Sequence, residues 1–480
     1  MNQVTPPTSM FTQLQRRTFL RRSGVGIGGA ALVSLAQAEH RSTPTAVNGG
    51  HPEMPQLPAR VKRVIFLCMA GGPSHLETFD YKPKLAEMDG QPMPTSYTAG
   101  QPIAQLQGKE LNCQGPLIGF QPCGNSGTMI SNFLPWHQKM ADDICVIRSM
   151  VTEQINHDPA HTFMNTGTAI SGRPSMGSWV NYGLGSESQN LPGFVVMTSV
   201  GGRNPQPIAS RQWASGFLPG RYQGVEFNST GAPVHYLESP AGVTNADQRQ
   251  VIDTVSQLNR YRNKQANNPA VETRIAAYEM AFRMQRSVPE LVDMSGEPKH
   301  VLDMYGAVPG DGSYASNCLL ARRLAERGVR FIQLYHRGWD HHGGLVKYMN
   351  TCCGLTDQPT WALVQDLKQR GMLDDTLIIW GGEFGRTPMF QGKGGAGRDH
   401  HIKGFSMWMA GGGIRNGSTY GNTDELGYSS VENVVHVRDL HATMLHLLGI
   451  DHDRFTVKHQ GLDLGLTGVE ESNVVQGILS

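Results

Sequence analysis

Residues 376–401 read TLIIWGGEFGRTPMFQGKGGAGRDHH, and this stretch decides the fold prediction. It opens with a short, apolar, β-rich run, Thr376–Trp380, which predicts a buried strand. Two glycines end the strand, and Glu383 follows at its carboxyl end, where ligands bind in open α/β sheets. A glycine-rich loop then leads to Asp-His-His at 399–401. A carboxylate at a strand end followed by such a loop typically supplies the nitrogen and oxygen ligands of a metal site.

Strand-like and helix-like stretches alternate along the rest of the chain. The apolar run 61–69 is typical of a strand that a parallel sheet buries on both faces. Further strands are expected at 144–150, 191–198, 329–335 and 405–410, and helices at 315–327, 359–370 and 439–449. Residues 245–300 have a polar, helical pattern, which predicts a helical insertion. The alternation predicts an α/β domain with a mostly parallel sheet over residues 61–470.

The N-terminus carries an export signal. Residues 16–20, RRTFL, form a twin-arginine signature, a Gly/Ala-rich apolar run follows, and Ala-Gln-Ala at 36–38 forms a cleavage site. We expect recognition by the twin-arginine export machinery, cleavage after Ala38, a linker at 39–60, and a periplasmic or cell-envelope location. A membrane anchor is the alternative. Because the apolar run is too short to span a bilayer and no other stretch is long enough, no stable membrane span is expected.

Composition excludes some classes of partner. Residues 1–38 hold four arginines and no acid, so their removal leaves 37 of the 41 basic residues against 40 acidic ones, or about −3. The mature chain has no basic run, which argues against nucleic acid as a partner. Seven cysteines form no CxxC pair. Cys113 and Cys123 could close a disulfide in an oxidising compartment, whereas the adjacent Cys352 and Cys353 suit helix or loop packing.

Clusters of His, Asp and Glu follow four of the strand-like runs, at 75–80, 157–161, 336–342 and 383–401. Packing alone does not readily place four such clusters at one sheet edge, so we predict a divalent metal, with zinc, manganese and calcium all open. The first cluster also has a structural interpretation. Ser74 could cap a short helix whose first turn holds the acids.

The arrangement resembles a known family. Six motifs carry the resemblance: GGPSHLETFD (71–80), PSMGSWVNYGLG (174–185), GWDHHGG (338–344), GGEFGRTP (381–388), GRDHH (397–401) and DLHATMLHLLGID (439–451). They are similar to the exported "domain of unknown function 1501" proteins, relatives of sulfatases within the alkaline-phosphatase-like superfamily. The resemblance implies a three-layer α/β/α sandwich. It also implies hydrolysis of phosphate or sulfate esters by a metal and a nucleophile at a helix N-terminus.

The resemblance also implies roles for residues after the later strands. Asp340 and His342 look like the superfamily's aspartate and histidine metal pair. Glu383 stands where sulfatases have the aspartate of an Asp-His-Gly turn, and Phe384 replaces the histidine.

The remaining metal ligands are less well defined by the motifs. His400 or His401 would be the histidine that returns to the site. Because the first strand lacks the usual aspartate directly after it, His75, Glu77 or Asp80 would have to take that place. The resemblance therefore leaves the number of metal ions open.

The nucleophile position departs from the sulfatase pattern. HDPAH at 157–161 has the spacing of C-x-P-S-R, so His157 replaces the nucleophile and His161 the arginine. No formylglycine can form there. His157 could be a metal ligand beside metal-activated water, or a covalent nucleophile. Ser175, in a motif loosely like the serine-glycine elbow of cofactor-independent phosphoglycerate mutases, and Thr162 are weaker candidates. His161 could serve as a catalytic acid or base.

Two functions follow from these patterns. The first is an exported metal-dependent hydrolase of phosphate, sulfate or related esters, with Arg386, Arg337 or Arg398 clamping an anionic oxygen. The second is a non-catalytic relative that has lost its nucleophile and binds glycans or an envelope partner. The arginines could equally be solvated loop residues.

Overall fold

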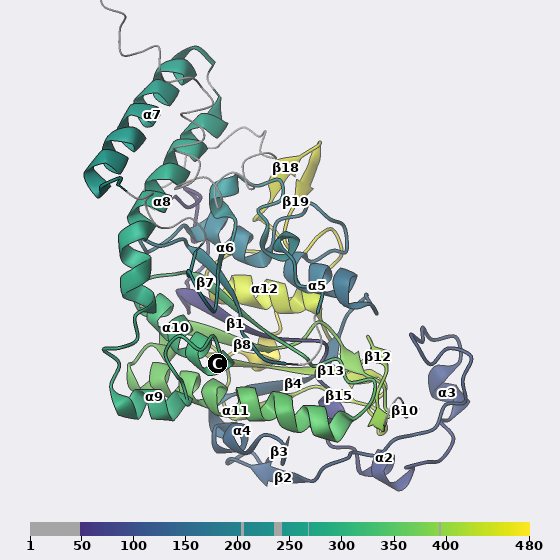
Figure 1. Cartoon of the computed structure of the whole chain (residues 1–480). Coiled ribbons are helices and arrows are strands. Elements are labelled where there is room, and N and C mark those ends of the chain that lie inside the picture. Colours follow the sequence, from purple (N-terminus) through teal and green to yellow (C-terminus); the bar gives the residue numbers. More distant parts are fainter. Residues whose placement is uncertain (1–48, 203–205, 235–241, 267, 393–394) are drawn as a thin grey trace, which may run out of the picture.

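The computed structural model describes residues 49–480 except 203–205, 235–241, 267 and 393–394 (Figure 1). The predicted signal peptide and residues 39–48 of the predicted linker lie outside the described residues. Residues 49–60 are held against the domain, since the backbone N–H groups of Gln56 and Leu57 both donate to Gly449.

A nine-stranded sheet forms the centre of the domain. Its order is β14-β4-β13-β8-β1-β7-β5-β6, with β17 paired to β4. The strands are β1 (Arg63–Ala70), β4 (Cys145–Val151), β5 (Phe194–Thr198), β6 (Val225–Phe227), β7 (Phe331–Arg337), β8 (Thr376–Gly381), β13 (Phe405–Gly411), β14 (Ser418–Tyr420) and β17 (Val435–His436). Only β13 runs antiparallel to its neighbours β4 and β8. The predicted mostly parallel α/β sheet is confirmed, and β1, β4, β7 and β8 end at the same edge.

Helices cover both faces of the sheet, as Figure 1 shows. Alternate residues of β1 enter different cores: Ile65 and Leu67 face one, and Val64 and Phe66 the other. The first core lies under α4 (Pro135–Lys139), α9 (Lys299–Tyr305), α10 (Tyr314–Glu326) and α11 (Leu345–Gln369). The second lies under α5 (His157–Thr166), α6 (Met176–Leu184) and α12 (Val437–Leu447). Every residue of β1 is buried between these layers, and the strand is apolar from Val64 to Ala70.

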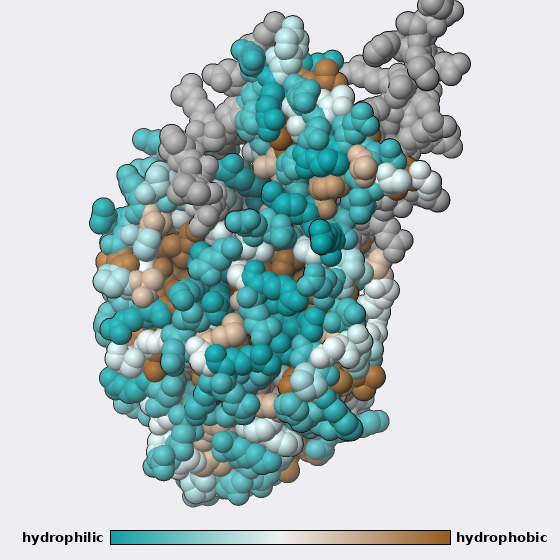
Figure 2. All heavy atoms as spheres, turned by 90° about the vertical axis from the view of Figure 1, so that its left-hand side faces the viewer, coloured by the Kyte–Doolittle hydropathy of each residue, from teal (hydrophilic) through white to brown (hydrophobic). Residues whose placement is uncertain are grey.

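The polar stretch after residue 244 forms the long helices α7 (Asn245–Ala266) and α8 (Pro269–Val292), at the predicted place. They lie at one end of the molecule in Figure 1. Figure 2 shows that side of the surface as mostly hydrophilic, with hydrophobic residues in small separate groups. Among the described residues, none of the helices is both long and apolar enough to cross a membrane.

Helix α11 begins earlier than the sequence indicated. Pro359 was expected at its first turn, yet it lies inside a helix that starts at Leu345. Buried Met349, Cys352 and Cys353 extend the helical pattern upstream of the proline. These two cysteines therefore pack within a helix, as one of the interpretations had it.

The possible Cys113–Cys123 disulfide is not formed. Cys113 lies in a small core with Leu106 and Met389, whereas Cys123 belongs to the main core. Every cysteine in the described part of the chain is free.

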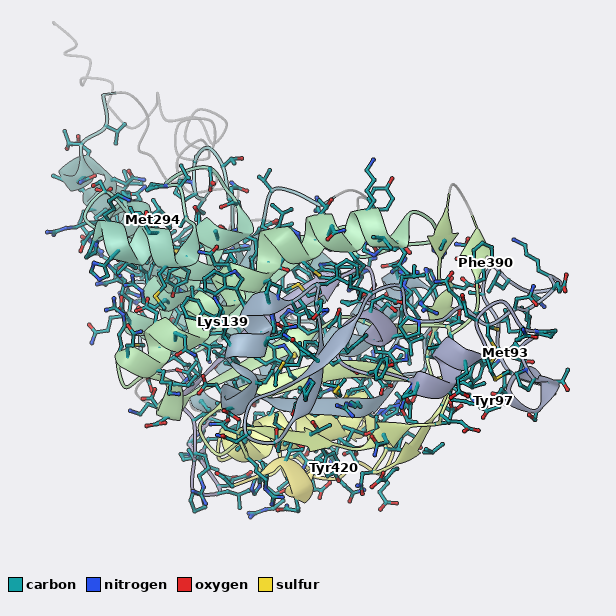
Figure 3. All side chains as sticks on the ribbon, turned by 90° about the horizontal axis from the view of Figure 1, so that it is seen from below. Met93, Tyr97, Lys139, Met294, Phe390 and Tyr420 are labelled. Atoms are coloured by element: carbon teal, nitrogen blue, oxygen red, sulfur yellow. The ribbon has the colours of Figure 1, made fainter. Side chains whose placement is uncertain are left out.

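Short elements gather beyond the carboxyl edge of the sheet, at one end in Figures 1 and 3. They are α2 (Pro83–Glu87), α3 (Thr95–Thr98), β9 (Gly385–Arg386), β10 (Gln391–Gly392), β11 (Ala396–Gly397), β12 (His400–His401), β15 (Asn422–Thr423) and β16 (Ser430–Glu432). Figure 3 shows Met93 and Tyr97 near Phe390. An isolated antiparallel β-bridge also pairs the backbone of Cys113 with that of Met389. The chain after β1 thus lies beside the loop after β8. The other short strands are β2 (Phe120–Cys123), β3 (Thr128–Ser131), β18 (Val457–His459) and β19 (Leu462–Leu464).

Candidate metal centre

Three of the four predicted clusters meet at the carboxyl edge of the sheet. His157 begins α5 after β4, Asp340 and His342 follow β7, and Glu383 follows β8. His400 reaches the same place from β12. Parallel strands bring their following loops to one edge, which is why residues far apart in sequence converge here.

The carboxylate of Asp340 lies at the centre of this cluster. Its Oδ1 is 2.9 Å from His342 Nε2 and 3.3 Å from both His157 Nε2 and His400 Nε2. The Arg386 guanidinium also donates to this oxygen at 2.7 Å. One carboxylate oxygen therefore faces three imidazole nitrogens and one cation.

The other ring nitrogen of each histidine has its own hydrogen-bond acceptor. His157 Nδ1 lies 2.6 Å from Glu383 Oε1, His342 Nδ1 lies 2.5 Å from Gln391 Oε1, and His400 Nδ1 lies 2.8 Å from the Ile155 carbonyl. Since these oxygens can only accept, each Nδ1 carries the proton. In the neutral form of each ring the lone pair is then on Nε2, the nitrogen that lies near Asp340. An acceptor that fixes the tautomer in this way is typical of metal-binding histidines.

Two of these lone pairs face each other, because His342 Nε2 and His400 Nε2 are 3.0 Å apart. A proton or a metal cation between them removes the repulsion. Two overlapping groups have ligand atoms close enough for one ion: His157, Asp340 and His400, and His157, His161 and Glu383. Nitrogen and carboxylate donors of this kind fit a divalent transition metal.

Glu383 and His161 form the inner part of the centre. Both Glu383 oxygens accept from the Gly71 N–H at 3.1 Å, and Oε1 lies 3.4 Å from His161 Nε2. Within the described part of the chain, neither ring nitrogen of the buried His161 has a hydrogen-bond partner. An unpaired buried imidazole is costly, and it points to an occupant beside Glu383.

Burial and charge shift the acid-base properties of the centre. Burial would raise the pKa of Glu383, but His161 and the hydrogen-bonded His157 lower it to about 2. Burial likewise opposes ionisation of Asp340, yet Arg386 and the histidines hold its pKa well below the usual range. Both carboxylates are therefore charged at neutral pH.

The pKa values of the histidines are shifted in different directions. Burial, opposed in part by Asp340, lowers the pKa of His400 to about 4. Burial also lowers the pKa of His161. Burial opposes the charge on His157, but hydrogen bonds to Asp340 and Glu383 outweigh it and raise the pKa of that imidazole. His400 and His161 are thus neutral at pH 7, the state that binds a metal.

Arg386 and Phe384 support the centre from the same loop. The buried Arg386 side chain also donates to the carbonyl groups of Gly71 and Gly72, so it is fixed. The Phe384 ring packs against His157 and His400, with ring centroids 4.9 and 4.6 Å away. Phe384 therefore fills space inside the cluster and contributes no ligand.

Three predicted metal ligands lie outside the cluster. His75 Nε2 contacts the Gly427 carbonyl at 3.0 Å, and Asp80 pairs with Lys82 at 3.0 Å. His401 Nε2 donates to the Tyr428 carbonyl. The strand geometry explains why His401 lies outside the cluster. Neighbouring residues of a strand point to opposite faces, so His400 enters the cluster and His401 turns away.

The serine and threonine candidates also lie apart from the cluster. Ser175 is buried at the start of α6, where its Oγ lies 3.0 Å from Ser178 Oγ. Thr162 donates back to the Asp158 carbonyl within α5. The buried Arg398 binds both carboxylate oxygens of Glu77, so it has a structural partner.

Sequence reasoning missed two glutamines, and it grouped Asp399 with the expected metal ligands. Gln391 contacts both His342 and Gln105, and Gln105 Nε2 lies 3.2 Å from His342 Nε2. Asp399 accepts from the Leu106 N–H at 2.8 Å and so anchors this segment. Amides carry no titratable group and form no ligand motif, so only the proximity of residues 101–111 to the later loop reveals them.

Solved structures that are similar to the chain have low sequence identity to it. The lipoteichoic acid synthase LtaP from Listeria monocytogenes is 9% identical, with 88% of this chain and 77% of that chain covered and a TM-score of 0.36. The PsFucS1 sulfatase from Pseudoalteromonas sp. is 13% identical, with 88% and 72% covered and a TM-score of 0.36. A protein of the alkaline phosphatase superfamily from Vibrio parahaemolyticus is 10% identical, with 95% and 81% covered and a TM-score of 0.36.

No curated protein sequence matches the chain. A protein family does match. Residues 61–479, most of the described domain, fit the family described as "Protein of unknown function (DUF1501)". The sequence motifs had suggested this family, and the chain belongs to it.

Proposed function

We propose that this protein is an exported, metal-dependent hydrolase of phosphate, sulfate or related esters. The observation that carries the proposal is the convergence of three imidazole Nε2 atoms on Asp340, each with its Nδ1 held by an acceptor. A purely structural cluster does not need three histidines in one tautomer around one carboxylate. Zinc or manganese suits this donor set better than calcium, which prefers oxygen ligands.

His157, His342, His400 and Asp340 would hold the ion. A divalent ion in this position would polarise an ester oxygen and lower the pKa of a water molecule at the site. Arg386 would balance the charge of Asp340 and of an anionic substrate from its fixed position. The N-terminus of α5, which begins at His157, would add favourable N–H dipoles for an anion.

A histidine is the group proposed to accept the proton of the attacking water. His161 is neutral, lies 3.4 Å from Glu383 and, within the described residues, has no hydrogen-bond partner at either nitrogen, so it could accept a proton from water. We propose His157 as a ligand, because Glu383 holds its Nδ1 and its Nε2 lies 3.3 Å from Asp340 Oδ1.

None of the residues proposed to hold the ion is a serine, threonine or cysteine. Burial and then the Glu383 charge raise the pKa of the Cys68 thiol well above the usual value, so it stays protonated. Water is therefore the proposed attacking group.

The absence of a side-chain nucleophile from that ligand set also favours the second candidate function, a non-catalytic relative that binds a glycan or an envelope partner through the same centre. A measurement of ester hydrolysis distinguishes the hydrolase from the non-catalytic binding protein. Protein loaded with zinc or manganese should hydrolyse p-nitrophenyl phosphate or sulfate, lose that activity with a chelator and regain it when metal is restored. His400→Gln should abolish turnover, and the matched variant His401→Gln should not. A folded, metal-loaded protein that hydrolyses no ester would support the binding function.

Export rests on the sequence of residues 16–38. Replacing Arg16 and Arg17 with lysine should keep the protein inside the cytoplasm. Cell fractionation would test this, and an unchanged distribution would contradict it.

A further inference from the structure

We propose that two glutamines act on His342 with opposite effects on ion binding: Gln391 prepares the imidazole for an ion, and Gln105 competes with the ion for the same nitrogen. This inference rests on the proposed function, because it concerns the same ion. It adds two residues that no motif marks, and it assigns Gln105 a part in controlling access to the centre.

The three side chains form a closed cycle of hydrogen bonds. His342 Nδ1 donates to Gln391 Oε1 at 2.5 Å, Gln391 Nε2 donates to Gln105 Oε1 at 3.3 Å, and Gln105 Nε2 lies 3.2 Å from His342 Nε2. An amide nitrogen only donates, so Gln105 must donate to the lone pair of His342 Nε2. Every donor and acceptor in the cycle is consistent with one tautomer of His342.

The surrounding structure holds Gln391 in a fixed position. It is buried, lies in β10, and this strand pairs with β11 through Gly397. Its amide oxygen holds the proton on His342 Nδ1, which leaves Nε2 free to bind an ion. Loss of an acceptor that orients a metal ligand usually weakens metal binding about 10- to 100-fold.

Gln105 occupies a different position relative to the same ring. Its side chain is exposed, while the neighbouring Leu106 is buried and its N–H is held by Asp399. The backbone is therefore anchored and the amide can swing away. His342 Nε2 also lies 2.9 Å from Asp340 Oδ1, so an ion between these atoms takes the lone pair that Gln105 uses. An ion must displace the Gln105 amide.

The two glutamines therefore predict changes of opposite sign. Gln391→Leu should weaken zinc or manganese binding about 10- to 100-fold. Gln105→Leu should tighten it by about 2- to 10-fold, which corresponds to one competing hydrogen bond. Gln391→Glu retains an acceptor and should restore binding. Gln107→Leu, two residues along the same exposed segment, is the matched control and should bind as the wild type does.

The experiment is competition between the full mature protein and a chelator of known affinity, with zinc and manganese added separately. Thermal unfolding of each metal-free variant confirms that it folds. The cobalt(II) absorption spectrum gives a second measure, which should change in Gln391→Leu and return in Gln391→Glu. Equal affinities for Gln391→Leu and the wild type, or weaker binding in Gln105→Leu, would overturn the inference while the proposed function stands. Absence of binding by the wild type would overturn both.

Discussion

Replacement of Glu383 by glutamine should destabilise the metal-free protein, because it removes the negative charge and replaces one of two buried acceptors with a donor. Both of its oxygens accept from the Gly71 N–H, and Oε1 also accepts from His157 Nδ1 at 2.6 Å. An amide has one oxygen and one NH₂ group of the same size. If the amide oxygen takes the Oε2 position, the NH₂ group faces His157 Nδ1, which loses its acceptor. If it takes the Oε1 position, one neutral oxygen serves both donors and the NH₂ group faces the Gly71 N–H.

The magnitude follows from these contacts. A buried donor left without a partner costs about 1–3 kcal/mol, and hydrogen bonds to a charged group are each worth about 1.5–3 kcal/mol. We therefore expect a loss of about 2–4 kcal/mol in the free energy of unfolding. The pKa of Glu383, lowered to about 2, has the same sign, since the fold stabilises the charged form at pH 7.

Urea denaturation at pH 7.5 with a chelator present would measure this loss. Glu110→Gln is the matched control, because Glu110 is exposed. It should change stability by less than about 0.5 kcal/mol. If Glu383→Gln were as stable as that control, the assignment of Glu383 as the acceptor for Gly71 and His157 would be refuted.

Three further predictions test other parts of the fold. Burial lowers the pKa of His336 to about 4, so the unfolded chain takes up a proton first as pH falls below about 6.5. Stability should then drop by about 2 kcal/mol between pH 6.5 and 5, and His336→Gln should remove that part in urea titrations. An equal drop in the variant would contradict it. Asp357→Ala leaves a buried histidine and two N–H groups of α4 unpaired and should cost about 3–5 kcal/mol by thermal or urea unfolding. A loss below about 1 kcal/mol would contradict this account of the pair. Gly72→Ala places a Cβ 2.7 Å from the Phe384 ring at a φ of +71°, whereas Gly100→Ala has a φ of +70° and open space. The left-handed backbone costs both variants the same, so the clash should make the first lose about 1–3 kcal/mol more than the second and weaken metal binding. Equal losses would show that Phe384 does not constrain the centre.

The sheet could be predicted from the sequence because its strands are apolar on both faces. β1 and β8 are apolar after their first residues, Arg63 and Thr376, so a run of apolar residues is a sufficient signal. The start of α11 could not be found as easily, because Pro359 suggested a helix start where the helix in fact continues.

The candidate centre was predictable only in part. Asp340, His342 and Glu383 follow strand ends, and topology then brings them together. The choice between His400 and His401 depends on the register of β12 against β9, which local sequence does not specify. His75 and Asp80 also follow a strand, yet a short 3₁₀ helix after β1 directs His75 toward Gly427.

The most direct test is the metal content of the folded, mature protein, purified without a chelator, together with Asp340→Ala and His401→Gln. The account predicts about one equivalent or more of zinc or manganese in the wild type and in His401→Gln. Asp340→Ala should retain the fold and lose the metal, since even an outer partner of a metal ligand changes affinity about 10- to 100-fold. Circular dichroism would confirm folding. A folded wild type without stoichiometric metal, or equal metal in Asp340→Ala, would contradict the account.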